Sequence, residues 1–418
     1  MTDTRMRQGR AALAFSFLVQ GVAFALLVTR IPAIQDRYGI SDALLPAFLA
    51  AVPVLAGVGS VVTERVVRRV APSLVLRWAQ PVVLLALLAV GVGQGMIQVA
   101  LALAVFGLAV GALDASMNML GVSLQRAYGR SIMLGFHAAY SLGGIAGASL
   151  AWLGAHGGWA LGVSYAPVVG VLLPLALVGS RWYVDAAAGP GVEAGGPGVE
   201  AGGKGNGRGV AFAVLLPFCL VMSFAYIGDS TVSNWSAKYL QDVLGSSEQT
   251  ATVPYNVYMV MTLLGRTLGD LGVRRFGAAA VVRAGAVLAA AGFALVAGAP
   301  GVAAGMAGFT LLGLGLCVLV PQTFAAAGRI GFEKGGPAGS DAAVARLNVF
   351  NYVGFLVGSP LVGVIGDAWS YRGAMLVPMV LVLVTVGYAR SFEGTGGRYG
   401  DGHERARAAD VGRDGHRL

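Results

Sequence analysis

The sequence predicts an all-α membrane protein with twelve transmembrane helices in two pseudo-symmetric six-helix halves. Three observations support this fold class: an apolar composition, an internal repeat, and twelve apolar segments of spanning length. Of the 418 residues, 56% are hydrophobic and 12% are charged, and the mean hydropathy is +0.73. Such a chain is too apolar for a soluble globular protein and too evenly apolar for a protein with a single membrane anchor.

The internal repeat consists of identical or similar polar residues that are separated by a constant shift of 206 residues. The shift relates the segment that contains Gln35, Asp36, Gly39 and Ser41 to Gln241, Asp242, Gly245 and Ser247. It also relates Glu64, Arg68, Arg69 and Arg77 to Asp270, Arg274, Arg275 and Arg283, and Gly59 and Gly107 to Gly265 and Gly313. A constant shift across loops on both sides of apolar segments indicates a tandem duplication, and parallel repeats of helices are typical of secondary transporters.

Apolar segments long enough to span a bilayer occur six times in each repeat. In the first repeat they lie near residues 11–29, 43–63, 74–97, 99–125, 131–155 and 159–180. In the second they lie near residues 210–234, 250–269, 279–299, 301–327, 342–366 and 372–390. The chain therefore divides into an N-terminal half (1–184), a flexible cytoplasmic linker (185–209), a C-terminal half (210–390) and a disordered cytoplasmic tail (391–418). The linker and the tail are Gly-rich and have little apolar surface to bury.

Basic residues predict how the helices are oriented in the membrane. If the N terminus is cytoplasmic, 25 of the 29 Lys and Arg residues lie in inner segments, and only Arg30, Arg37, Lys238 and Arg372 lie at outer ends. The positive-inside rule then predicts a multi-pass protein of the cell membrane with both termini in the cytoplasm. An anionic inner leaflet accounts for the net charge of +9, so nucleic acid is not expected as a partner.

The polar loop between the second and third expected helices carries the main resemblance to a known family. Its charged and polar residues are Ser60, Glu64, Arg65, Arg68 and Arg69, and the second repeat has Asp270, Gly272, Arg274, Arg275 and Gly277 at the equivalent position. This pattern resembles the signature loop of the major facilitator superfamily, in which Asp and Gly occupy the places of Glu64 and Val67. The resemblance covers the whole chain and implies two six-helix halves, alternating access and a loop that stabilises the outward-facing state.

A narrower resemblance, to a poorly characterised bacterial branch near fucose-permease-like transporters, depends on three segments. They are Asp114-Ala-Ser-Met-Asn118, Phe136-His137 with Ser141-Leu-Gly-Gly144, and Asp229 with Asn234-Trp235-Ser236. Asn234 stands where this pattern has Asp, which removes one candidate proton carrier. Small residues at four-residue spacing, Gly143 with Gly147 and Gly354 with Gly358, predict close helix packing.

Asp114 is the only carboxylate expected well inside a span. An ionised side chain there costs about 3 kcal/mol on insertion scales, so a function is the default hypothesis. Because desolvation favours the neutral form of a carboxyl group, Asp114 is the preferred proton carrier, with His137 and Asp229 as further candidates. Asn118, one turn away, is expected to orient it. The alternative is a structural role, in which Asp114 connects two helices by hydrogen bonds and takes no part in transport.

Further polar residues are candidates for substrate binding and gating. The substrate-binding candidates, which equally suit a role in joining helices, are Gln20, Asn118, Tyr140, Asn256, Asn348 and Asn351. The gating candidates at the cytoplasmic loops, which equally suit a role in topology alone, are Glu64, Arg65, Arg68, Arg69, Asp270, Arg274 and Arg275. A second gate is predicted as an ion pair of Arg30 with Asp229, because each lies 19 residues above its expected helix start. The alternative is two independent interfacial charges.

The sequence thus predicts a secondary transporter for a small neutral or cationic solute that works by alternating access and is coupled to protons. No Lys or Arg is expected near the membrane midplane, where an anionic solute needs a partner. The alternatives are an efflux antiporter for drugs or metabolites and a sensor or scaffold with the same fold. No catalytic arrangement or metal-ligand spacing is present, so neither an enzyme nor a cofactor is expected. The expected partners are solute, protons and lipid, with no obligate protein partner.

Overall fold

The computed structural model describes residues 3–41, 44–185, 211–247, 250 and 253–393. The N-terminal half consists of α1 (Asp3–Thr29), α2 (Ile31–Tyr38), α3 (Leu45–Val66), α4 (Pro72–Val92), α5 (Met96–Tyr128), α6 (Met133–His156), α7 (Leu161–Gly179) and η1 (Ser180–Trp182). The C-terminal half consists of α8 (Phe212–Lys238), η2 (Tyr239–Val243), α10 (Val253–Phe276), α11 (Ala278–Ala297), α12 (Val302–Leu316), α13 (Leu319–Ala368), α14 (Tyr371–Ala374), α15 (Leu376–Tyr388) and η3 (Ala389–Phe392). The predictions for the linker and the tail fall almost wholly outside the described residues.

The predicted all-α membrane fold is confirmed. Among the described residues, eight helical segments are apolar and long enough to cross a membrane, and one of them runs from Val302 to Ala368. This segment is broken inside α13, where Gly336 has a φ of 60° and is followed by Pro337, which has no N–H to donate. When the segment Val302–Ala368 is divided at Gly336, the eight segments become nine. The helices α3, α6 and α10 complete the twelve expected spans.

The backbone repeats at the same shift as the sequence. The short helices after α1 and α8 are followed by Gly39 and Gly245, which have φ values of 62° and 67°. Only glycine adopts this left-handed conformation without strain, which explains its presence at both positions. The hydroxyl groups of Tyr38 and Tyr239 donate to the carbonyls of Val90 and Val296, which are themselves related by the shift.

Glycine allows two helix pairs to approach closely, one in each half. A Cβ atom on Gly143 in α6 would lie 2.0 Å from the carbonyl oxygen of Leu18 in α1. A Cβ atom on Gly354 in α13 would lie 2.5 Å from the carbonyl oxygen of Ser223 in α8. The backbones of α1 with α6 and of α8 with α13 therefore touch where the sequence has its small residues.

Substitution of Gly143 by alanine is expected to destabilise the N-terminal half by about 1–3 kcal/mol, because the added methyl group forces the helices apart. The measurement is the melting temperature of the purified protein in detergent. Gly170→Ala in α7 is the matched control, since a Cβ atom there meets nothing within 4 Å. Equal melting temperatures for the two variants would contradict the close approach.

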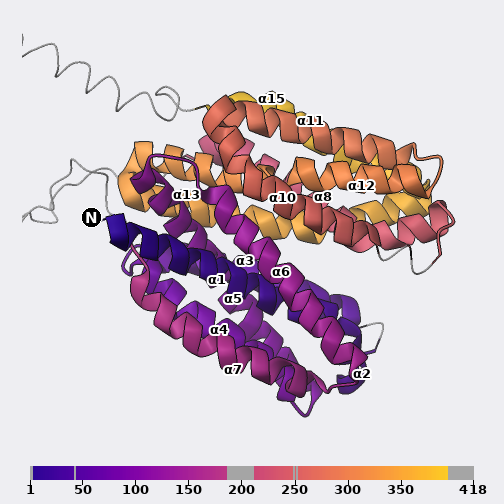
Figure 1. The fold of residues 1–418 in the computed structure, drawn as a ribbon, viewed down its shortest axis with the longest axis horizontal. Helices are drawn as coiled ribbons and strands as arrows, with labels where there is room; N and C mark the ends of the chain where they lie inside the picture. Colours follow the sequence, from indigo (N-terminus) through magenta and orange to yellow (C-terminus); the bar gives the residue numbers. More distant parts are fainter. Residues whose placement is uncertain (1–2, 42–43, 186–210, 248–249, 251–252, 394–418) are drawn as a thin grey trace, which may run out of the picture.

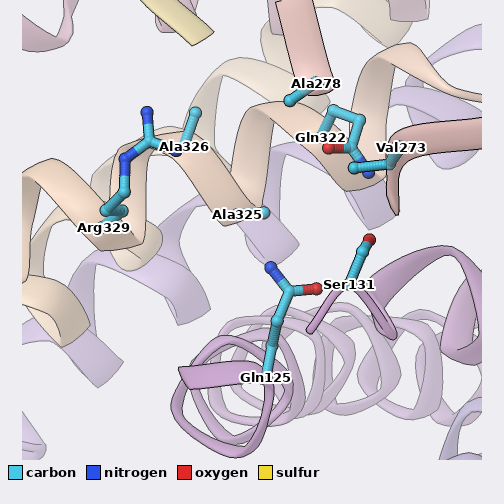
Figure 2. Close-up of a pocket in the computed structure, with 8 residues that line it drawn as sticks. All are labelled: Gln125, Ser131, Val273, Ala278, Gln322, Ala325, Ala326 and Arg329. Carbon is cyan, nitrogen blue, oxygen red and sulfur yellow. The ribbon is translucent and has the colours of Figure 1, made fainter. Parts of the chain in front are cut away.

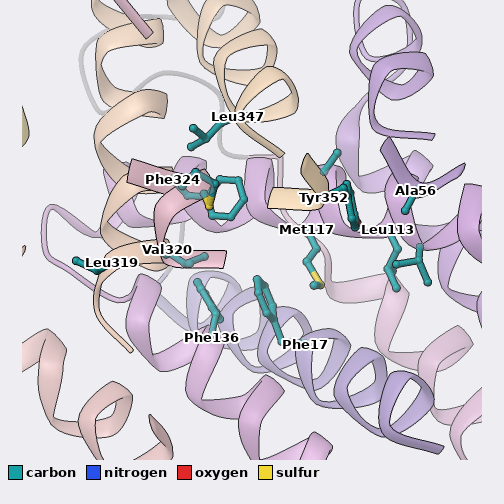
Figure 3. Packing of buried hydrophobic residues seen from close by; sticks show 14 of the residues in the cluster. Phe17, Ala56, Leu113, Met117, Phe136, Leu319, Val320, Phe324, Leu347 and Tyr352 are labelled. Carbon is teal, nitrogen blue, oxygen red and sulfur yellow. The ribbon is translucent and has the colours of Figure 1, made fainter. Parts of the chain in front are cut away.

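The two halves meet at the end that holds the N terminus and diverge toward the end that holds α2 (Figure 1). Buried apolar side chains from both halves fill the junction (Figure 3). The rings of Phe17 and Phe136 stack with centroids 5.5 Å apart, and Phe324 and Tyr352 lie opposite them in the C-terminal half. We refer to the joined end as the closed end and to the other as the open end.

Candidate functional site

The carboxylate of Asp114 joins the two halves of the molecule near the middle of the helices. Its Oδ1 accepts a hydrogen bond from Gln20 Nε2 on α1 at 3.1 Å. Its Oδ2 accepts from the Tyr352 hydroxyl at 2.9 Å and from Asn351 Nδ2 at 3.2 Å, both on α13. The three donors are buried, whereas Asp114 keeps partial exposure. The carboxylate is therefore a bridge between the halves.

Buried polar groups extend this bridge toward the closed end. Asn348 Nδ2 on α13 donates to Ser60 Oγ on α3 at 2.9 Å, and Ser60 in turn donates to the Gly111 carbonyl at 3.1 Å. Asn351 Nδ2 also contacts Asn348 Oδ1, at 3.4 Å. A buried amide without a hydrogen-bond partner raises the free energy of the folded protein, so these contacts favour the arrangement in which the halves are joined. Two predicted substrate ligands, Asn348 and Asn351, thus lie at the junction of the halves.

Asn118 does not contact the Asp114 carboxylate, which corrects the prediction that it orients this group. Asn118 Nδ2 donates instead to the main-chain carbonyl of Asp114 at 2.9 Å, one helical turn back. Its Oδ1 lies 3.3 Å from His137 Nε2, and the His137 ring packs between Phe17 and Phe324. The group that contacts the carboxylate within the N-terminal half is Gln20, which the sequence predicts as a substrate ligand or as a residue that joins helices.

A second carboxylate, Asp229 on α8, accepts a hydrogen bond from the Tyr258 hydroxyl on α10. Tyr140 on α6 and Tyr226 on α8 lie within electrostatic range of both Asp229 and Asp114. Asn256, another predicted substrate ligand, is exposed in the first turn of α10. Two phenol groups are therefore close enough to interact with both carboxylates.

The predicted ion pair of Arg30 with Asp229 is absent from this conformation. Arg30 donates to the carbonyls of Ala151 and Trp159, at 3.2 Å each, within its own half. The reason is depth: α1 ends immediately before Arg30, whereas α8 continues nine residues beyond Asp229. At 1.5 Å per residue, these nine residues place Asp229 about 13 Å from the outer end of α8, whereas Arg30 lies at the outer end of α1. The expected helix starts place the two residues at equal depth.

At the closed end, charged groups connect the halves. Arg346 on α13 contacts Glu64 Oε1 on α3 through Nε and Nη2, each at 3.1 Å. In the pseudo-symmetric position, Asp270 on α10 accepts from Ser131 Oγ at 2.5 Å and from Gly135 N at 2.9 Å. The second contact places a carboxylate at the start of α6, where main-chain N–H groups have no helical partner.

The arginines of the two signature loops differ in what they contact. Arg274 reaches across the halves and donates to the Ser131 carbonyl at 2.6 Å. Arg65, Arg68, Arg69 and Arg275 are exposed, and the contact of Arg68 with Glu64 lies within one helix. The important cation at Glu64 is Arg346, which the loop pattern missed because it lies 282 residues away along the chain.

Arg266 corrects the expectation that no Lys or Arg lies deep in the span. The expected segment 250–269 places Arg266 close to its cytoplasmic end, but α10 extends from Val253 to Phe276, so Arg266 lies near the middle of this helix. Its Nη1 donates to Ser141 Oγ at 2.6 Å and contacts the His137 carbonyl at 3.4 Å, both on α6 of the other half. Neutral oxygens therefore hold this guanidinium in place.

A small cavity lies between the halves at the closed end (Figure 2). Its lining residues are Gln125, Ser131, Val273, Ala278, Gln322, Ala325, Ala326 and Arg329. Gln125 Oε1 accepts from the main-chain N–H groups of Ile132 and Met133 at 3.0 Å, whereas Gln322 Nε2 has no hydrogen-bond partner in the described structure. The cavity volume of about 10 Å³ is close to what one water molecule needs, so this is not a solute site.

No family model matches the chain, but curated proteins resemble it over most of its length. An uncharacterized MFS-type transporter of Yersinia pestis is 29% identical over 381 residues, which are 90% of this chain and 94% of that protein. An uncharacterized transporter of Sinorhizobium fredii is 26% identical over 366 residues, 86% of this chain and 92% of that protein. The membrane protein MosC of Rhizobium meliloti is 27% identical over 389 residues, 91% and 89% of the two chains.

Solved structures give the same assignment of fold. FucP, a major facilitator superfamily transporter in its outward conformation, superposes with a TM-score of 0.72 at 18% identity, covering 92% of this chain and 99% of FucP. The proton:xylose symporter XylE superposes with a TM-score of 0.72 at 13% identity, covering 94% and 96%. The protein is thus a multi-pass membrane protein with the major facilitator fold. Its resemblance to the transporters of that superfamily, fucose-permease-like members included, is confirmed.

Proposed function

We propose that the chain is a proton-coupled secondary transporter that moves a small neutral or cationic solute by alternating access. The observation that carries this proposal is the Asp114 carboxylate, which accepts hydrogen bonds from both halves. Hydrogen bonds to an ionised acceptor are about twice as strong as those between neutral groups. Proton uptake by Asp114 therefore weakens the contact with Asn351 and Tyr352 and makes it easier for the halves to separate.

The conformation supports one order of events. Solute and proton enter from the open end, where the halves diverge (Figure 1). Protonation of Asp114 then weakens the central bridge, and the closed end separates when Arg346 leaves Glu64 and Arg274 leaves Ser131. An outward conformation is also the state in which FucP was solved. Alternating access then requires the open end to close behind the solute.

The closed end is proposed to face the cytoplasm of a cell membrane, because most basic residues lie there. Single cysteines in place of Lys238 and Lys334, both exposed, are expected to react with a membrane-impermeant maleimide from opposite sides. The native Cys219 and Cys317 are buried and give a low background. Reaction of both introduced cysteines from one side would overturn this orientation.

The charge of the proposed solute follows from the groups between the halves. Two carboxylates, Asp114 and Asp229, and the phenol groups of Tyr140 and Tyr226 lie close enough to interact electrostatically. Carboxylates and phenols suit hydroxyl groups or an ammonium group of a solute and repel an anion. Arg266 lies in the same region, and its Nε and Nη1 donate to the carbonyls of Cys317 and His137 and to Ser141 Oγ.

The test is transport by purified protein in liposomes with an imposed proton gradient, screened with neutral polyols and sugars, amines and organic acids. We expect a neutral or cationic member of the screen to accumulate, and a protonophore to abolish the accumulation. Saturable accumulation of an organic acid alone would contradict the solute class. Movement of solute and protons in opposite directions would support the efflux antiporter. A ligand that raises the melting temperature without any transport would support the sensor or scaffold.

A further inference from the structure

Gln20, a hydrogen-bond partner of Asp114, has a buried polar atom without a partner among the described residues. Its side chain is buried, with 5% exposure, and Nε2 donates to Asp114 Oδ1. Its Oε1 is also buried and has no hydrogen-bond partner in the described part of the chain. Asn351 and Tyr352 also donate to the carboxylate, so all three of these side chains present donors, as an ionised carboxylate requires.

A protonated Asp114 requires a hydrogen-bond acceptor, because its O–H group donates. The amide of Asn351 is held in its orientation, because Nδ2 also contacts Asn348 Oδ1, and Asn348 in turn donates to Ser60. The amide of Gln20 has no second hydrogen bond among the described residues to hold its orientation. A half-turn about its terminal bond places Oε1 where Nε2 now lies, and Asp114 Oδ1–H can then donate to it.

We propose that Gln20 is a positioning residue for the coupling proton, and that its amide inverts when Asp114 is protonated. This inference depends on the proposed function. In either orientation one atom of the Gln20 amide has no partner. Gln20 can therefore hydrogen-bond to the ionised and to the protonated form of Asp114 and does not strongly favour one of them. The other titratable groups that face Asp114 are Tyr352 from α13, Tyr140 from α6 and Tyr226 from α8.

The inversion has a directional consequence. Gln20 and Asp114 lie in the same half, so the contact of α1 with α5 survives protonation. The donors from the other half, Asn351 and Tyr352, lose the charge of their acceptor. Proton uptake therefore loosens the junction between the halves and leaves the N-terminal half intact.

The test is infrared difference spectroscopy of the full-length protein on acidification, with the carboxyl C=O band of Asp114 identified by its loss in Asp114→Asn. We expect Gln20→Met to shift this band to higher frequency, as for a carboxyl group without an acceptor, and to lower proton-driven accumulation about tenfold. Gln20→Glu, whose carboxyl group can also donate and accept, is expected to restore the band position. Gln322→Met is the matched control, since Gln322 is another buried glutamine with an unpartnered amide atom, and it should leave the band unchanged.

Three outcomes distinguish the claims. A shifted band in Gln20→Met with an unchanged band in Gln322→Met supports the inversion. An Asp114 band that is the same in Gln20→Met as in the unaltered protein would overturn it, because the proton would then have another acceptor. The absence of any Asp114 band on acidification would overturn the proposed proton carriage itself, and the role of Gln20 with it.

Discussion

Asp114→Asn is expected to abolish proton-driven accumulation of the solute while exchange of solute across the membrane persists. An asparagine at this position neither gains nor loses a proton, so the gradient no longer drives transport. Its amide has nearly the same shape and keeps an oxygen that can accept from Tyr352 and Asn351. We expect accumulation to fall at least about tenfold, to the level without a gradient, with counterflow changed only a few-fold.

The measurements are accumulation and counterflow in proteoliposomes that contain equal amounts of each protein. An Asn variant that still concentrates solute against its gradient would assign proton carriage to Asp229 or another group. A purely structural Asp114 would give a different result: the yield and the melting temperature would fall, and coupling would be preserved in the protein that remains.

Removal of the ion pair of Glu64 with Arg346 is expected to populate the conformation in which the closed end has separated. The two side chains are 14% and 30% exposed, so solvent screens the pair only in part. We therefore expect Glu64→Gln to shift the equilibrium by about 1–2 kcal/mol, roughly tenfold in population. Spin labels at the exposed positions of Arg65 and Lys334 report the closed end, and labels at Asp36 and Asp242 report the open end.

The expected result is a longer distance at the closed end together with a shorter distance at the open end. Arg68→Gln is the control, because it removes only the contact of Glu64 with an arginine that is 64% exposed and lies on the same helix. Equal distance changes in Arg68→Gln and Glu64→Gln would show that the contact within α3, and not the contact between halves, controls the equilibrium.

The fold could be predicted from the sequence because its signals are local or periodic. Apolar segments and repeated polar loops gave twelve spans in two halves, and the left-handed Gly39 and Gly245 show that the repeat extends to the backbone. Helix ends were less predictable, since polar residues continue a helix beyond the apolar segment. This affects depth directly: the expected segment ends at residue 269, close to Arg266, whereas α10 runs to Phe276 and has Arg266 near its middle.

The sequence could predict only those site residues whose presence in a membrane span is energetically unfavourable by itself. Asp114 stood out because a charge inside a membrane is expensive. Its partners did not, because Gln20 and Tyr352 lie 94 and 238 residues away and meet it only through the packing of three helices. Which face of a helix turns toward another half depends on that packing, and a single sequence has no signal for it.

The most direct test of the central claim is the distance between spin labels at the closed end as a function of pH. If the ionised Asp114 carboxylate joins the halves, the label pair at Arg65 and Lys334 should move apart as the pH falls. In Asp114→Asn the distance between the labels should be longer than in the unaltered protein even at neutral pH. The further increase that depends on protonation of Asp114 should be absent. An Asn variant whose distances follow pH as the unaltered protein does would contradict the account.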